Sequence, residues 1–324
     1  MPLNERSLIE RYFKGCGAPR TDVPLGVGDD AALLDCPDGM QLVAAMDTLV
    51  CGIHFLEGSN PTSIGHRALA VNLSDIAAMG AEPAWALLGL TLPNADEAWL
   101  QSFATGLGML AKKHNVALVG GDTTSGPLCI TVQVLGHAPR PAKMLRSGAK
   151  PGDVLFVSGT PGDAAAGLAL EKGQLPETPA AADAYLRHRF LFPTPRVELG
   201  RHLREYASAC IDVSDGLLGD AGKLADASRC GIAINYDQLP ISAQLESAVG
   251  DTRARELALT GGDDYELCFA VPQSNIDQLN RDFPPAQWGY SPIGVLRDGQ
   301  GGAVVTRDGI VMDFSHSGWD HFGS

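Results

Sequence analysis

Four stretches of this sequence that combine an aspartate with an adjacent glycine are candidates for chemistry. These stretches are residues 26–32, with the sequence Gly-Val-Gly-Asp-Asp-Ala-Ala, and residues 120–124, 212–216 and 261–266. Glycine permits a tight turn, so each stretch can present an acid at a corner of the chain. Adjacent carboxylates repel unless both face water or a cation lies between them. One Gly-Asp turn is ordinary turn chemistry, but four acidic corners support the hypothesis of a bound metal.

Seven aspartates are candidates for one oxygen-ligand site: Asp29, Asp30, Asp47, Asp75, Asp122, Asp212 and Asp215. Magnesium takes carboxylates, waters and substrate phosphates rather than soft ligands. Thr48, Thr123 and Ser214 add hydroxyl groups beside three of these acids. Phosphoryl transfer by this chain would depend on several metal ions held by acids. Arg146 is an additional candidate cation there, unless it is a solvated linker residue.

Apolar runs indicate which elements position these acids. Residues 41–46 predict a buried strand that delivers Asp47 at its end. Residues 116–119 predict a strand that runs into Asp122. A helix is expected from residues 61–63 to Gly80, and Asp75 interrupts its apolar stripe, where a buried acid needs a partner.

The same patterns extend over both halves of the chain. Further helices are expected at residues 3–13, 94–114, from about 163, 182–190 and 196–207, and further strands at residues 128–135, 154–157 and 266–271. After Asp212, either Ser214 or Asp215 is expected to cap a helix over residues 217–225. Mixed strands and helices in both halves predict α/β (α+β) domains, each with its own sheet.

Length and composition limit the domain organisation and the partners. A chain of 324 residues predicts two domains. We place the boundary between 1–139 and 140–324, at a proline-punctuated stretch that carries Lys143, Arg146 and Lys150. The net charge of −14 disfavours a nucleic-acid or anionic membrane surface. No apolar run approaches the roughly 18 residues of a membrane helix, and no signal-peptide core is found at the N-terminus.

Other site chemistries fit the sequence less well. Seven scattered cysteines without a Cys-x-x-Cys pair argue against a disulfide frame or a zinc site, and agree with a reducing cytoplasm. The chain has no EF-hand acid array, no Walker A sequence and no kinase-type glycine-rich loop ahead of a strand lysine. Ser214 is not in a Gly-x-Ser-x-Gly elbow, and none of the eight histidines has triad or zinc spacing. Cys16, in a glycine-rich loop, is more typical of an inert cysteine than of a nucleophile.

The combined motifs resemble those of the thiamine-monophosphate kinase family. The resemblance rests on residues 26–32, Asp47 and Thr48 with His54 six residues further on, and residues 70–80, 120–124, 212–216, 261–267 and 318–322. It extends from the N-terminal helix to the last residues. The family belongs with aminoimidazole ribonucleotide synthetase and selenophosphate synthetase in a two-domain superfamily. The resemblance therefore implies an aminoimidazole ribonucleotide synthetase-like architecture that dimerises through the N-terminal sheet and binds ATP and magnesium.

The resemblance also implies an activity and a role for individual residues. It implies direct transfer of the ATP γ-phosphoryl group to thiamine monophosphate in a cytoplasmic homodimer, with no nucleic-acid or membrane partner. Several Mg²⁺ ions would be held by Asp30, Asp47, Asp75, Asp122, Asp212 and Asp215, with Asp29 and Thr48 as helpers; Asp30, Asp47, Asp122 and Asp212 would be the catalytic acids. ATP would contact Gly121, Asp122, Arg146 and Ser214. Thiamine monophosphate would contact His54, Asp263 and Trp319.

Two alternative functions stay open from the sequence. The first is another ATP-dependent small-molecule synthetase of the same superfamily. Selenophosphate synthetase is disfavoured within it, because the Cys16 loop lacks the neighbouring cysteine and lysine that such enzymes use. The second is a non-catalytic module that binds divalent metal or nucleotide. Magnesium-dependent ATP consumption only in the presence of thiamine monophosphate separates the kinase from both.

Overall fold

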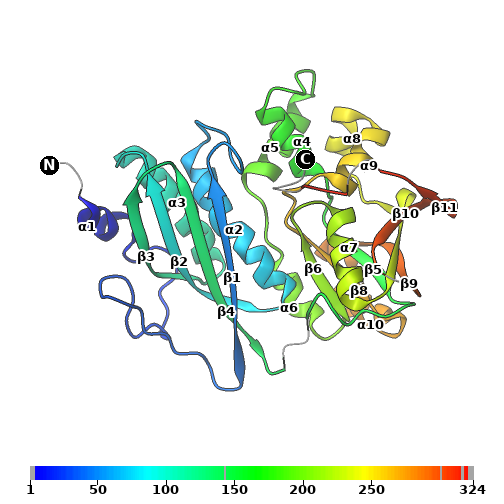
Figure 1. Ribbon diagram of the computed structural model, residues 1–324, viewed down its shortest axis with the longest axis horizontal. Helices are drawn as coiled ribbons and strands as arrows, with labels where there is room; N and C mark the ends of the chain where they lie inside the picture. Colours follow the sequence, from blue (N-terminus) through cyan, green and yellow to red (C-terminus); the bar gives the residue numbers. More distant parts are fainter. Residues whose placement is uncertain (1–3, 142–143, 300, 315–316, 320–324) are drawn as a thin grey trace. The chain divides into compact units, whose positions relative to one another are not determined.

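The computed structural model describes residues 4–141, 144–299, 301–314 and 317–319, and the chain forms two compact units (Figure 1). Unit 1 comprises Met1–Ile76 and Ala81–Ala142, and unit 2 comprises Ala77–Gly80 and Lys143–Ser324. Each unit has its own sheet, as the mixed strand and helix patterns predict. None of the helices in the described ranges has the length and apolar character needed to span a membrane.

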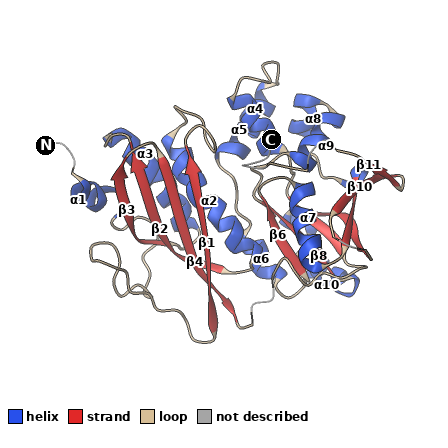
Figure 2. Ribbon diagram, viewed as in Figure 1, coloured by secondary structure: helices blue, strands red, loops and turns tan. Residues whose placement is uncertain are grey.

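Unit 1 is a four-stranded sheet with helices packed on one face (Figure 2). The strand order is β1-β4-β2-β3, in which only β2 and β3 are parallel. Its elements are α1 (Glu5–Leu8), the π-helical turn η1 (Ile9–Phe13), β1 (Met40–Val50), α2 (Pro61–Ala78), β2 (Glu82–Leu92), α3 (Glu97–Lys113), β3 (Ala117–Ser125) and β4 (Cys129–Pro139). Gly65 of α2 and Gly106 of α3 let these two helices touch, because a Cβ on Gly106 would lie 1.9 Å from the carbonyl oxygen of Thr62.

Two expectations about the strands of unit 1 are wrong. β1 is an edge strand, not a buried one, since it alternates between the helix-covered face and an open face on which Leu42 is 57% and Met46 64% exposed. The period of two in a strand explains this, because only one face of the sheet packs on helices. Asp47 and Asp122 therefore lie within β1 and β3, and neither follows the end of a strand.

Unit 2 is built on a seven-stranded mixed sheet in the order β11-β10-β7-β9-β5-β8-β6. Its strands are β5 (Val154–Ser158), β6 (Ala209–Val213), β7 (Gly231–Asn235), β8 (Glu266–Val271), β9 (Tyr290–Arg297), β10 (Ala303–Arg307) and β11 (Ile310–Met312). Its helices are α4 (Asp163–Glu171), α5 (Ala180–Leu191), α6 (Val197–Leu203), α7 (Leu217–Ser228), the 3₁₀ turn η2 (Tyr236–Gln238), α8 (Ala243–Val249), α9 (Asp251–Thr260), α10 (Gln273–Asp282) and α11 (Pro285–Trp288). The predicted helix over residues 196–207 is shorter in the structure.

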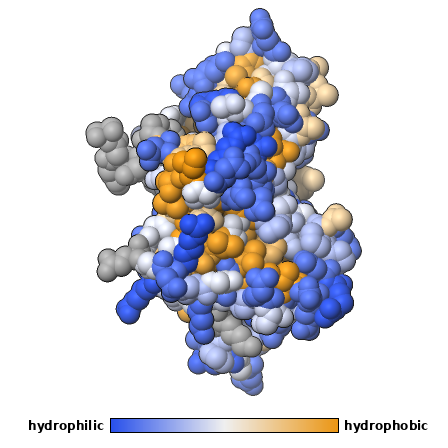
Figure 3. Space-filling view, turned by 90° about the vertical axis from the view of Figure 1, so that its right-hand side faces the viewer, coloured by the Kyte–Doolittle hydropathy of each residue, from blue (hydrophilic) through white to orange (hydrophobic). Residues whose placement is uncertain are grey.

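The core of unit 2 forms where α7 packs on the sheet. Leu217 and Leu224 of α7 join Ile211 of β6 and Ile232 of β7 in one buried apolar cluster. At the other end of the sheet, β10 alternates between buried Val305 and exposed Val304. Figure 3, which faces the side of β9, β10 and β11 in Figure 1, shows apolar surface beside hydrophilic surface there. This end of the sheet thus packs on one face only.

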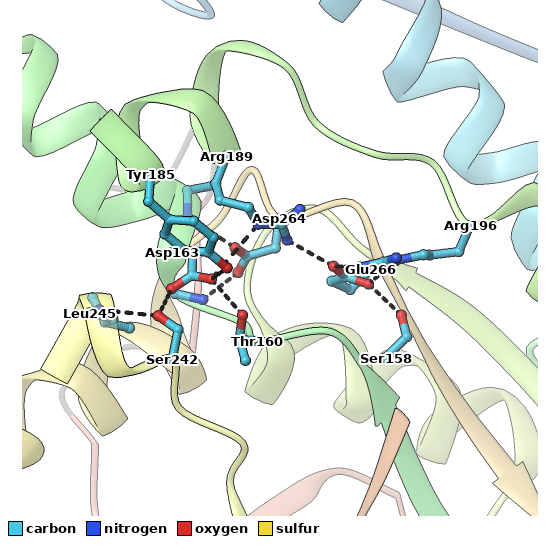
Figure 4. Close-up of polar contacts among 12 residues, drawn as sticks. Ser158, Thr160, Asp163, Tyr185, Arg189, Arg196, Ser242, Leu245, Asp264 and Glu266 are labelled. Carbon is cyan, nitrogen blue, oxygen red and sulfur yellow. Dashed lines mark hydrogen bonds and ion pairs between the residues drawn. The ribbon is translucent and has the colours of Figure 1, made fainter. Parts of the chain in front are cut away.

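A buried polar network joins β8 to helices α4 and α5 (Figure 4). Glu266 is fully buried and accepts hydrogen bonds from both Arg189 and Arg196, at 2.6–2.7 Å. Burial alone would raise the pKa of Glu266, but the charges of these guanidinium groups, Arg196 foremost, outweigh it and lower the pKa. The hydroxyl of Ser158 also donates to Glu266. Ionised Glu266 therefore ties the β8 strand to α5 and to the segment before α6.

Two further acids complete this network. Asp264 accepts hydrogen bonds from the backbone N–H groups of Gly162 and Ala164 at the start of α4, at 2.6 and 3.2 Å. Asp163 accepts hydrogen bonds from the hydroxyls of Thr160, Tyr185 and Ser242. Burial raises the pKa of both carboxyl groups. Asp264 and Glu266 of the fourth acidic corner are thus satisfied inside unit 2.

We expect Glu266→Gln to lower the free energy of unfolding by about 3 kcal/mol at pH 7, because it removes the charge that the mostly buried Arg189 and Arg196 both contact, although Arg189 keeps Asp163 at 3.7 Å. Since folding lowers the pKa of Glu266, its contribution is present above its ordinary value of 4.5 and is lost as the pH falls through the folded-state pKa. Urea unfolding of both proteins at several pH values measures this. The difference in the free energy of unfolding between the wild type and Glu266→Gln should become smaller below pH 4.5.

The matched control is Glu177→Gln, because Glu177 is an exposed glutamate in the loop between α4 and α5. A surface substitution of this kind changes stability by less than about 0.5 kcal/mol. An equal effect of the two substitutions at pH 7 would show that the network does not stabilise unit 2.

Candidate active site

A groove in unit 1 brings together the first two acidic corners. It has a volume of about 980 Å³ and lies between the N-terminal helical segment, the loop of residues 27–32 and strands β2 and β3. Asp29, Asp30, Gly121 and Asp122 line it. This volume is at the upper end of the range for small-molecule sites. The groove is therefore large enough for a nucleotide.

The loop that carries Asp29 and Asp30 is anchored on the open face of the sheet. Val23, Ala32 and Leu34 pack against an apolar cluster around Trp85. Asp22 accepts a hydrogen bond from the indole N–H of Trp85 at 3.2 Å and forms an ion pair with Arg20. The hydrogen bond from Arg20 holds the pKa of Asp22 below its ordinary value. Anchors on both sides thus hold the acidic corner beside β3.

Gly121 is required by the backbone of β3. Its φ is +146°, and a Cβ at this position would lie 1.9 Å from the carbonyl oxygen of Leu88 on β2. Any side chain would therefore push β3 away from β2. Asp122 follows immediately and is exposed on the open face. The glycine thus fixes the strand that presents Asp122 to the groove.

The register of the sheet separates Asp122 from Asp47 and Thr48. Thr48 is paired with Thr131, and their hydroxyl oxygens are 2.8 Å apart. Thr131 is paired with Gly89, which is paired with Asp122. Three strand spacings of about 4.8 Å place Thr48 roughly 14 Å from Asp122 on the same face of the sheet. Because neighbouring residues of a strand point to opposite faces, Asp47 lies on the helix-covered face.

The sequence predicts that Asp75 needs a partner, and in the structure this partner is Asp47. The two carboxyl groups are in hydrogen-bond contact. Burial raises the pKa of Asp47, and the contact with Asp75 partly offsets this increase. With both acids ionised, the pair would repel unless a cation lies between them. The chemistry of this pair fits a divalent cation with oxygen ligands.

His54, also in unit 1, lies in the turn after β1. Its Nδ1 accepts a hydrogen bond from the backbone N–H of Val50 at 3.0 Å. Neutral imidazole with Nδ1 as the acceptor carries its proton on Nε2. His54 therefore offers a donor at Nε2.

In unit 2 the third and fourth acidic corners meet each other and the C-terminal segment. The carbonyl oxygen of Ser214 accepts from the N–H of Asp263 at 2.8 Å, and that of Asp215 accepts from the N–H of Trp319 at 2.9 Å. Asp263 and Tyr265 have φ angles of +73° and +52°. Left-handed residues other than glycine are strained, and such strain clusters at functional sites. The structure thus places the backbones of Asp263 and Trp319 against the third corner. Residues 320–322 of the last motif lie outside the described residues, as does Lys143.

The start of α7 differs from the prediction. Gly216 is the N-cap residue, and neither Ser214 nor Asp215 caps the helix. Instead, Asp220 from inside the helix reaches back, and its Oδ2 accepts from the N–H groups of Ser214 and Asp215, both at 3.0 Å, and from that of Gly216. Asp212 is nearly buried in β6. Sequence reasoning missed Asp220, although an acid in the first turn of a helix was the available signal.

Arg146 and Ser214 lie at opposite ends of α7 in unit 2. The carbonyl oxygen of Arg146 accepts from the hydroxyl of Ser228, the last residue of α7, at 3.0 Å. The helix has 12 residues and is about 18 Å long. Ser214 precedes the other end of this helix. Within unit 2, Arg146 and Ser214 therefore do not form one subsite.

No three His, Cys, Asp or Glu side chains of the described ranges form a group that could hold a metal by themselves. The seven candidate aspartates are thus divided among the groove, the Asp47–Asp75 pair and the third corner, and they do not form one cluster. Magnesium is usually held by one or two carboxylates together with waters and substrate phosphates. The groove acids and the Asp47–Asp75 pair fit this mode of binding.

We expect Gly121→Ala to destabilise unit 1 more than Gly28→Ala does. Both glycines have positive φ, at +146° and +128°, but a Cβ on Gly28 meets nothing within 4 Å. Gly28→Ala therefore measures backbone strain alone, about 1–3 kcal/mol, whereas Gly121→Ala adds a clash with Leu88. Thermal melting of both variants measures the difference. Equal melting temperatures would contradict the role of Gly121 in strand packing.

Comparisons with known proteins agree with this architecture. Family models of AIR synthase related protein match the chain in two parts, the N-terminal domain at residues 28–138 and the C-terminal domain at residues 150–307. The thiamine-monophosphate kinase of Salmonella typhimurium is 45% identical over 324 residues, with 100% of both chains covered. These matches extend over both units.

Solved structures give the same result. The crystal structure of thiamine-monophosphate kinase from Stenotrophomonas maltophilia K279a is 43% identical, has a TM-score of 0.83, and covers 95% of this chain and 98% of its own. AaThiL, solved in complex with AMPPCP and TMP, is 34% identical, with a TM-score of 0.78 and coverage of 91% and 92%. The chain therefore belongs to the thiamine-monophosphate kinase family of AIR synthase related proteins.

Proposed function

We propose that this protein transfers the γ-phosphoryl group of ATP to thiamine monophosphate and forms thiamine diphosphate. The observation that carries the proposal is the groove of unit 1, in which two glycine corners present Asp29, Asp30 and Asp122. AaThiL, which shares the fold and 34% of its residues, was solved with AMPPCP and TMP. A nucleotide in this groove would place its phosphates beside these acids, which favours binding together with cations.

Magnesium ions are the cations that we propose for this site. Asp30 and Asp122, with Asp29, would hold one group of magnesium ions together with the phosphates in the groove. Asp47 and Asp75 would hold a second group of ions. Bound magnesium would neutralise phosphate charge and stabilise the charge that develops during transfer. Thr48 faces the open side of the sheet with Thr131, so we assign it a role apart from the Asp47–Asp75 pair. Asp212 of unit 2 would be a further ligand.

The two substrates would use different parts of the chain. We assign ATP contacts to Gly121 and Asp122, with Ser214 and Arg146 as additional contacts from unit 2. Trp319, which is 61% exposed, offers an indole face on which the cationic thiazolium or the pyrimidine ring of thiamine can stack. Asp263 contacts the same corner through its backbone, and His54 would donate from Nε2.

The quaternary state and the cellular location are also proposals. The open face of the unit 1 sheet carries exposed Leu42 and Met46 on its edge strand β1. Exposed apolar side chains on an edge strand favour association with a second chain. We therefore propose a homodimer through the N-terminal sheet. We place the enzyme in the cytoplasm, where its seven free cysteines would stay reduced.

The experiment that tests the function measures ATP consumption with and without thiamine monophosphate and magnesium. The proposal expects ADP and thiamine diphosphate in equal amounts only when both are present. Consumption of ATP with another small molecule would indicate a different synthetase. Magnesium-dependent ATP binding without turnover would indicate a binding module.

We expect Asp122→Asn and Asp47→Asn each to lower kcat on the order of 10²-fold or more, because each removes a charge from a proposed metal subsite while preserving the side-chain shape. Asp38→Asn is the control, since Asp38 is an exposed acid in the turn before β1. Steady-state kinetics, with circular dichroism to confirm folding, measure the effect. Near-normal turnover of both variants would remove these acids from the catalytic machinery.

We expect Trp319→Ala to raise the KM for thiamine monophosphate and to leave the KM for ATP almost unchanged. Stacking on an aromatic ring contributes about 1–3 kcal/mol, which corresponds to roughly a 5- to 150-fold change. Trp319→Phe keeps an aromatic face and should restore most of the affinity. If Trp319 only packs against unit 2, Trp319→Ala will lower the melting temperature and leave the KM for thiamine monophosphate as it was.

A further inference from the structure

The third acidic corner already contains a cation. The ammonium group of Lys223 on α7 lies 2.6 Å from Oδ2 of Asp215 and 2.8 Å from Oδ1 of Asp220. These are the lengths of charge-assisted hydrogen bonds. Lys223 therefore bridges the two acids that flank the start of α7.

The carboxylate oxygen of Asp220 that faces residues 214–216 already accepts several hydrogen bonds. It is 1% exposed, and its Oδ2 accepts three backbone N–H groups, from Ser214, Asp215 and Gly216. Its Oδ1 is the oxygen that contacts Lys223. A metal ion between Asp215 and Asp220 would have to displace the ammonium group to reach either of these contacted oxygens. The loop geometry also depends on Asp220, so this acid cannot turn away to form a new site.

We propose that Lys223 is the resident cation of the third corner and occupies the position that a metal ion would take between Asp215 and Asp220. Asp215 is then a partner of Lys223 and not a magnesium ligand, which differs from the role that the family resemblance implies for it. This proposal rests on the proposed function in one respect, because the proposed function supplies the other metal sites of the chain. It predicts that this chain binds its metal ions without Asp215.

The charges at the corner support this assignment. The side chain of Lys223 is 46% exposed and lies against two carboxylates, so its ammonium group carries the ordinary positive charge of a lysine. Asp215, Asp220 and Lys223 together leave one net negative charge, and the N-terminal end of α7 offsets part of it through its dipole. The contact of Lys223 with Asp215 and Asp220 is therefore nearly neutral without a divalent ion.

Counting bound metal ions tests the proposal. The full chain is titrated with MnCl₂ in the presence of AMPPCP, and free Mn²⁺ is measured by electron paramagnetic resonance. Lys223→Met removes the ammonium group and leaves Oδ2 of Asp215 and Oδ1 of Asp220 without their cation, so we expect one additional Mn²⁺ per chain. Lys223→Arg keeps the charge and should bind the same number as the wild type. In Lys223→Met combined with Asp215→Asn, the additional ion should disappear.

A second variant keeps the proposal testable if Lys223→Met does not fold. Asp215→Asn in the wild-type background should leave the Mn²⁺ count unchanged. Loss of one Mn²⁺ in this variant, or equal counts in the wild type and a folded Lys223→Met variant, would overturn the proposal. The number of bound Mn²⁺ ions can be measured without any catalytic turnover. Failure of the proposed kinase reaction would appear separately, as an absence of thiamine diphosphate.

Discussion

Repulsion between closely spaced carboxylates is the constraint on which both units depend. The chain carries a net charge of −14 and places acids at adjacent positions in two of its glycine corners. Each group of acids is compensated in a different way. Glu266 is buried between Arg189 and Arg196, and Asp264 is satisfied by backbone N–H groups. Asp29, Asp30 and Asp122 face an open groove that Arg6 and Lys14 also line, and there the compensation can come from these side chains and from ions in solution. This difference distinguishes acids that stabilise the fold from acids available for a ligand.

The hydrogen bonds of Arg189 and Arg196 to Glu266 help to fix the fourth acidic corner, residues 261–266. Glu266 and Asp264 fix the backbone on both sides of Tyr265, which has a left-handed φ, as does Asp263. The hydroxyl of Tyr265 donates to Asp263 at 3.3 Å. Strained residues persist only where the surrounding structure determines them strongly. The buried network therefore supplies the rigidity with which unit 2 can present Asp263, although none of its buried acids lies open to a ligand.

The sequence predicted the acidic corners, the two-unit α/β organisation and most helices and strands of unit 1, because these features depend on local turns and periodicity. It did not predict β2, since the residues Glu82–Leu92 lie in the middle of a sheet and lack an alternating pattern. It assigned β1 to a buried position, because an apolar edge strand and a central strand have similar composition. The two arginines were missed for another reason. Each compensates Glu266 from a distant part of the sequence, and Arg189 lies 77 positions from it. Lys223 lies only three positions after Asp220, and it was missed because Asp220 itself was missed.

The period of the strands explains why the candidate aspartates do not form a single site in unit 1. Asp47 and Thr48 are neighbours in the sequence but point to opposite faces of β1. Thr48 shares its face with Asp122, yet β4 and β2 lie between their strands. A magnesium ion with ligands at about 2.1 Å cannot bridge the roughly 14 Å that separates them. Phosphates of one bound nucleotide can extend over several ångströms, whereas one metal ion cannot. The candidate acids of unit 1 therefore lie on two faces of the sheet, and under the proposed function the bound substrates would connect them.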